Sequence, residues 1–74
     1  MADEMIVRNT DVLAGKPVIR GTRISVEFIL DLLADGWSVE DVLQSYPHLS
    51  KEQITACLHY ARDLLQSENV SPAA

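Results

Sequence analysis

Residues 38–67 read SVEDVLQSYPHLSKEQITACLHYARDLLQS, and this stretch contains two helix patterns separated by a tight turn at residues 46–49. Ser38, with Asp41 three residues later, has the spacing of a capping box, which marks the start of the first helix. Pro47 ends that helix because proline has no backbone N–H with which to continue it. Two helices joined by so short a turn are typical of the helix-turn-helix motif, and also of many small all-α domains that bind no DNA.

The second helix of this pair is predicted over about residues 51–67. Ser50 and Gln53 form a full capping box, in which the Gln53 side chain reaches back to the Ser50 backbone amide. Apolar residues then recur at helical spacing. The predicted apolar face consists of Ile54, Leu58, Ala61 and Leu65, flanked by Cys57 and Leu64.

A further helix is predicted before this pair, over about residues 26–35. Ser25 is a good N-cap, and Gly36 is the glycine expected just after the last helical turn. The predicted buried stripe is Val26, Ile29, Leu30 and Leu33. Phe28 and Leu32 lie off this stripe, so the helix is apolar over more of its circumference than one core requires, and a second apolar contact is expected.

The N-terminal third is predicted to be extended, with short β-prone runs at residues 5–8 and 17–20. The predicted fold class is therefore mostly α: a three-helix, homeodomain-like helix-turn-helix bundle with a short extended N-terminal arm. We divide the chain into residues 1–24, an arm for dimerisation that includes a basic turn, residues 25–67, the helical domain, and residues 68–74, a disordered tail.

Composition limits the chain to one small domain. It has 74 residues, 47% of them hydrophobic, and a single cysteine, so it has no internal disulfide and no Cys/His cluster with metal spacing. No cofactor is expected. Because a chain this short buries little surface, oligomerisation is the remaining way to stabilise it, and we expect a homodimer. The dimerisation candidates are the apolar residues of the arm: Met5, Ile6, Val7, Val18 and Ile19.

The cellular location and the charge are also informative. No apolar run approaches the length of a membrane span and the first residues lack signal-peptide features, so we expect a cytoplasmic protein that does not enter a membrane. The formal net charge of -5 opposes nucleic-acid binding, since affinity for phosphate comes from Lys and Arg. Four of the six basic residues lie in the first 26, however: Arg8, Lys16, Arg20 and Arg23.

Catalysis has little support in the sequence. His48 and His59 lack a nucleophile or carboxylate partner at a recognisable spacing. Cys57 lies beside the apolar face of its helix, where a lone cysteine is typically a small buried hydrophobe. We therefore predict that the protein is not an enzyme.

The most distinctive segment is the glycine turn Arg20–Arg23, which precedes a capped helix. Paired guanidinium groups suit phosphate or carboxylate recognition, and the alternative is that one of them pins the arm to acidic residues of the helical body. Residues 15–24, read together with 36–38, 46–50 and 56–61, closely resemble the family known as domain of unknown function 433, or DUF433. The likeness extends over about residues 5–66.

This resemblance implies a small homeodomain-like bacterial protein, commonly considered the antitoxin of a toxin-antitoxin pair, that binds a PIN-like nuclease toxin and forms homodimers through its N-terminal segment. It also implies that Arg20–Arg23 is the signature turn of the family and that a recognition-type helix starts at Ser50. The DNA-binding candidates are Arg20, Thr22, Arg23, Lys51, Gln53 and Thr55, with promoter DNA as the further partner. The competing hypothesis is a protein-interaction module of the same fold that binds no DNA.

Overall fold

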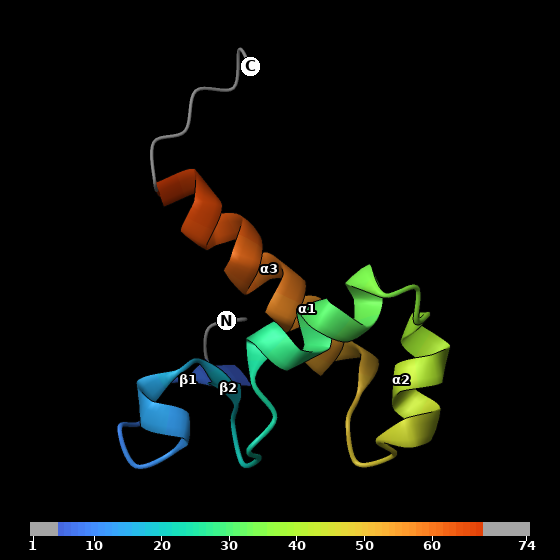
Figure 1. Ribbon diagram of the computed structural model, residues 1–74, viewed down its shortest axis with the longest axis horizontal. Coiled ribbons are helices and arrows are strands. Elements are labelled where there is room, and N and C mark those ends of the chain that lie inside the picture. Colours follow the sequence, from blue (N-terminus) through green and yellow to red (C-terminus); the bar gives the residue numbers. More distant parts are fainter. Residues whose placement is uncertain (1–4, 68–74) are drawn as a thin grey trace.

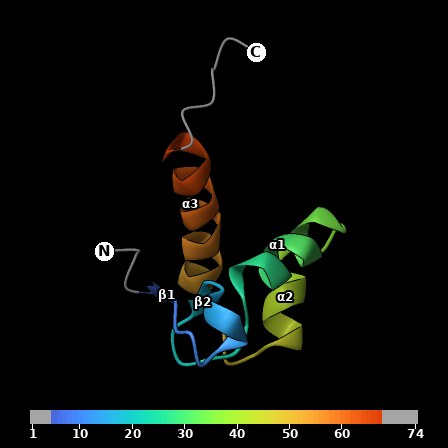
Figure 2. The same ribbon diagram turned by 60° about the vertical axis from the view of Figure 1, so that its left-hand side comes forward.

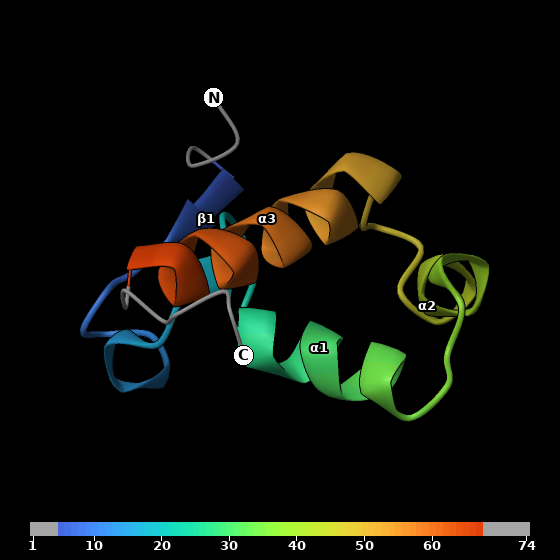
Figure 3. The same ribbon diagram turned by 90° about the horizontal axis from the view of Figure 1, so that it is seen from above.

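The computed structural model describes residues 5–67, and the tail predicted at residues 68–74 lies outside these described residues. In chain order the elements are β1 (Ile6–Val7), the 3₁₀ turn η2 (Leu13–Gly15), β2 (Val18–Ile19), α1 (Val26–Ala34), α2 (Val39–Ser45) and α3 (Lys51–Ser67) (Figure 1). The mostly α class, the three helices and the extended arm are confirmed. Seen from above, α1 lies beside α3, and α2 lies next to the start of α3 (Figure 3).

The predicted helix caps are present. Ser25 Oγ accepts a hydrogen bond from Phe28 N at 2.9 Å and opens α1. The capping box of α2 is complete, with Asp41 Oδ2 accepting from Ser38 N at 2.9 Å and Ser38 Oγ accepting from Asp41 N at 3.0 Å. These hydrogen bonds hold the pKa of the Asp41 carboxyl below its usual value, because they favour the charged form. The short loops between the helices are therefore fixed by local side-chain contacts.

The C-terminal end of α1 and its second apolar contact are also as predicted from the sequence. Gly36 adopts a φ of +102°, and Trp37 N donates back to Leu32 O at 3.1 Å, as in a Schellman motif. Phe28 packs its ring against Tyr46, with centroids 5.8 Å apart and an edge-on angle of 89°. The off-stripe aromatic of α1 thus anchors the end of α2.

The two strands form a minimal antiparallel sheet in which Ile6 pairs with Ile19 and Val7 pairs with Val18. β2 is held on its other side by the segment that leads into α1, because Ile19 N donates to Ile24 O at 2.9 Å. The strands are not a separate layer. One apolar cluster joins them to all three helices, and its buried members are Ile6, Ile19, Val26, Ile29, Val42, Leu49, Ile54, Ala56 and Cys57.

The apolar face predicted for α3 is wrong in its second half. Leu58 is 43% exposed and Leu65 is 59% exposed, whereas Ala56, which lay off the predicted stripe, is buried. α3 extends beyond the elements that cover it, and its residues 62–67 are all exposed (Figure 2). For α1 the predicted stripe is right, since Val26 and Ile29 are buried and the other two members pack against the same cluster.

The turn η2 was not predicted. Leu13 and Ala14 have φ values of +49° and +56°, in the left-handed region that side chains with a Cβ rarely adopt. No turn-forming glycine, asparagine or aspartate stands at these two positions to signal that conformation.

Candidate functional site

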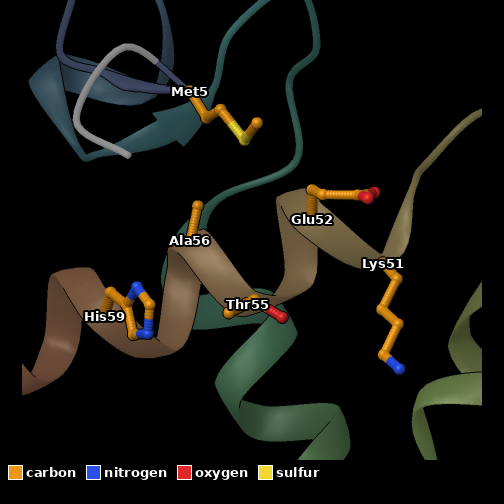
Figure 4. A pocket seen from close by; sticks show the side chains of 6 residues that line it. All are labelled: Met5, Lys51, Glu52, Thr55, Ala56 and His59. Atoms are coloured by element: carbon orange, nitrogen blue, oxygen red, sulfur yellow. The ribbon is translucent and has the colours of Figure 1, made fainter. Parts of the chain in front are cut away.

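A shallow pocket of about 470 Å³ lies between the start of β1 and the first half of α3 (Figure 4). Its lining residues are Met5, Lys51, Glu52, Thr55, Ala56 and His59. Met5 forms the side nearest the strands, and the other five belong to α3. The pocket therefore opens between α3 and the strand side of the protein.

Three polar side chains follow one another along this face of α3. Lys51, Thr55 and His59 are four residues apart, so they stand one above the other on the helix, and all three are exposed. A lysine in the first turn faces the positive end of the helix dipole, so Lys51 does not stabilise the helix there. His59 was not among the sequence candidates, although its four-residue spacing from Thr55 was available as a signal.

The signature turn is attached to the wall of this pocket. Arg20 N donates a hydrogen bond to Met5 O at 2.8 Å, and Met5 lines the pocket. Gly21 has a φ of +81°, a conformation that glycine adopts at no steric cost. The backbone of the turn is therefore hydrogen-bonded to the residue that forms the strand side of the pocket.

The six DNA-binding candidates divide into two groups. Arg20, Arg23, Lys51 and Thr55 are exposed on the surface. Thr22 and Gln53 are instead engaged with the backbone. The Thr22 hydroxyl donates to Ile19 O at 2.8 Å and accepts from Ile24 N at 3.0 Å.

The Gln53 side chain is likewise hydrogen-bonded to the backbone. Its Oε1 accepts from Ser50 N at 2.8 Å, and Gln53 N donates to Ser50 Oγ at 3.2 Å. This is the predicted capping box of α3. A bidentate contact with adenine would need the Gln53 carbonyl oxygen that the cap occupies.

The dimerisation candidates mostly face inward. Ile6, Val18 and Ile19 are buried in the protein's own core, with 8%, 2% and 0% of their surface exposed. Met5 and Val7 are half-buried. The arm therefore offers a second copy little more than the outer edge of the two-residue strand β1.

Residues 5–67 include neither a metal-binding cluster nor a membrane-spanning helix. No group of three His, Cys, Asp or Glu side chains in this range is placed to hold a metal ion. The described helices include none with the length and apolar character needed to cross a membrane.

Cys57 is fully buried, and burial raises the pKa of its thiol to about 11, from 9.0. Because the folded state keeps the thiol protonated, stability should be constant below about pH 9 and fall as the pH rises from there towards 11. At pH 8 we expect a thiol reagent to label the native protein at least about tenfold more slowly than the urea-unfolded chain. Equal labelling rates would show that Cys57 is accessible in the fold.

Comparison with known proteins places this geometry in a family. The family model described as "Protein of unknown function (DUF433)" matches residues 6–61. The uncharacterised protein y4eO of Sinorhizobium fredii is 40% identical over 60 residues, which are 81% of this chain and 27% of y4eO.

A crystal structure of a DUF433 member from Anabaena variabilis superposes with a TM-score of 0.79 at 28% identity, covering 85% of this chain and 62% of that one. This chain thus spans about a quarter of y4eO and under two thirds of the Anabaena protein. The chain belongs to the DUF433 family.

Proposed function

We propose that this chain is an antitoxin-type helix-turn-helix protein that acts as a homodimer, binds operator DNA through the start of α3, and binds a PIN-like nuclease toxin. One observation carries the DNA-binding part. The exposed residues Lys51, Thr55 and His59 line one pocket with Met5, and Arg20 N, at the start of the basic turn, donates a hydrogen bond to Met5 O. The toxin partner is supported by the resemblance to DUF433 described above.

The charge distribution supports an anionic ligand at this place on the molecule. The chain has a formal net charge of -5, yet the pocket face and its adjoining turn carry Lys51 and two arginines. Guanidinium and ammonium groups that cluster against an acidic background are suited to bind phosphates and to orient the protein on the duplex.

The alternative is an interaction module of the same fold that binds a protein and no DNA. Glu52 favours this reading, because its carboxylate lines the same pocket and would repel a phosphate. The DNA-binding function predicts operator binding that weakens with salt, whereas the interaction module predicts no operator binding at any salt concentration.

For the DNA-binding function, we expect operator affinity to fall steeply with salt, with a slope of about -0.9 for each phosphate neutralised. The double variant Arg23→Ala with Lys51→Ala removes two cations per chain. It should flatten the slope by up to about 3.6 units in a dimer. The measurement is binding to the promoter DNA at several salt concentrations, with thermal melts to confirm that the variant folds.

Lys16→Ala is the matched control. Lys16 Nζ lies 3.2 Å from Glu27 Oε1 in an exposed ion pair, so its loss costs little stability and removes no charge from the pocket face. The slope should stay unchanged in this variant. Undetectable binding of the unaltered protein at low salt would contradict DNA binding and favour the interaction module.

A further inference from the structure

Another pocket, of about 330 Å³, lies at the corner between α1 and α2. We call it the tryptophan pocket, and its lining residues are Asp35, Gly36, Trp37, Asp41 and Ser45. In Figures 1 and 3 the loop that joins α1 to α2 lies at the far end of the molecule from β1. The tryptophan pocket is therefore separate from the pocket that Met5 lines.

The tryptophan pocket belongs to a strongly acidic part of the chain. Residues 24–50 contain five acidic residues and no lysine or arginine, so their formal charge equals the -5 of the whole chain. All five are exposed: Glu27, Asp31, Asp35, Glu40 and Asp41. Lys16 pairs with Glu27 at 3.2 Å, but residues 24–50 supply no such cation for the two carboxylates at the pocket.

The acidic residues of α1 stand where they oppose the helix. Glu27, Asp31 and Asp35 recur every four residues, and like charges at this spacing repel each other on a helix surface. Asp35 is also the C-cap of α1, where the helix dipole favours positive charge. Asp41 differs, because it caps the start of α2. Formation of α1 therefore does not explain a carboxylate at Asp35, whereas a cationic ligand in the pocket would.

Trp37 gives the pocket an aromatic wall. It is 36% exposed, and the carboxylates of Asp35 and Asp41 line the same cavity. The face of a tryptophan ring attracts cations, and a guanidinium group both stacks on aromatic rings and forms paired hydrogen bonds with carboxylates. Asp41 Oδ2 already accepts from Ser38 N at 2.9 Å, which fixes that carboxylate before a ligand arrives. The pocket thus combines the two kinds of group that recognise guanidinium.

We propose that the tryptophan pocket binds an arginine side chain of a partner protein, with the guanidinium stacked on Trp37 and paired with Asp35 and Asp41. The four-residue spacing continues from Asp35 to Asp31 along the same side of α1, so neighbouring basic residues of the partner meet a further carboxylate. Free arginine lacks those neighbours, and its own carboxylate would be repelled by the acidic surface. The occupant is therefore a basic protein segment.

This inference goes beyond the proposed function and does not depend on operator binding. The acidic surface of residues 24–50 repels phosphates, so DNA at the start of α3 and a basic segment at the tryptophan pocket would use surfaces of opposite charge. The partner is defined here by an exposed arginine with basic residues next to it.

The fluorescence of Trp37 tests the proposal directly, because Trp37 is the only tryptophan of the chain. The probe is a tetra-arginine peptide with blocked ends, added to the full chain in about 0.15 M salt. We expect the emission to shift to shorter wavelength as the peptide covers the ring. A tetra-lysine peptide should bind at least about threefold more weakly, since an ammonium group neither stacks nor pairs in the same way. Free arginine should bind at least about tenfold more weakly.

Asp35→Asn should weaken binding of the tetra-arginine peptide at least about fivefold, because it removes one of the two carboxylates that line the pocket. Glu40→Gln is the matched control. It removes the same charge from an exposed residue of α2 that does not line the pocket, and it should change the affinity less than about twofold. Trp37→Leu, followed by the anisotropy of a labelled peptide, should weaken binding at least about threefold. Circular dichroism checks that each variant folds.

An unchanged Trp37 emission, or equal weakening by Asp35→Asn and Glu40→Gln, would overturn the proposal. Equal affinity for tetra-lysine would overturn the choice of arginine. An emission that shifts with the concentration of the protein alone would show that a second copy fills the pocket, and would also overturn it. Peptide binding without operator binding would instead remove the DNA-binding function and leave this inference standing.

Discussion

Replacing Ile54 by alanine is expected to lower the free energy of unfolding by about 2–5 kcal/mol. Ile54 is completely buried in the cluster that joins the strands to the helices, so the substitution opens a cavity at the centre of the molecule. Small domains have a total stability of about 5–15 kcal/mol, so this loss should bring the protein close to unfolding. Urea denaturation followed by circular dichroism measures it.

Leu58→Ala is the informative comparison, because Leu58 is one turn further along α3 and is 43% exposed. At concentrations where the chain is monomeric, this substitution should cost less than about 1 kcal/mol. A loss as large as that of Ile54→Ala in the monomer would mean that α3 packs through the face the sequence predicted.

The contrast between these two residues shows how far the sequence alone could predict the fold. Helix starts were predicted correctly, because a cap depends on side chains within three residues of one another, as Ser50 and Gln53 do. Helical spacing also grouped Ile54 with Leu58 on one face. Spacing does not say how far along the helix that face is covered, since coverage depends on elements distant in sequence.

Prediction of the candidate site from the sequence was limited in a similar way. The exposed cations Arg23 and Lys51 were recognisable from residue type alone. Thr22 and Gln53 were also reasonable candidates, because a hydroxyl or an amide can bind either a ligand or the backbone. In the structure, both side chains form hydrogen bonds with the backbone. The pocket itself required knowing that Met5 lies against α3, a contact between residues some fifty positions apart in the sequence.

The second large effect is expected at Thr22. Thr22→Val keeps the shape of the side chain but removes the hydroxyl that accepts from Ile24 N and donates to Ile19 O. The Ile24 amide would lose its acceptor in a partly buried turn, and such a loss costs about 1–3 kcal/mol. Thermal and urea unfolding measure this change, and Thr22→Ser, which retains the hydroxyl, should recover most of the stability.

The same pair of variants separates two roles of the signature turn. If Thr22 acts only by fixing the backbone, Thr22→Ser should bind operator DNA with the affinity and salt slope of the unaltered protein, and Thr22→Val should weaken binding only as far as it loosens the turn. If the hydroxyl contacts a phosphate instead, Thr22→Val should lose affinity with no loss of stability. The hydroxyl lies 2.8 Å from Ile19 O and 3.0 Å from Ile24 N, and these two bonds already engage it as both donor and acceptor. We therefore expect the first outcome, in which Thr22 holds the turn and the arginines on either side of it meet the ligand.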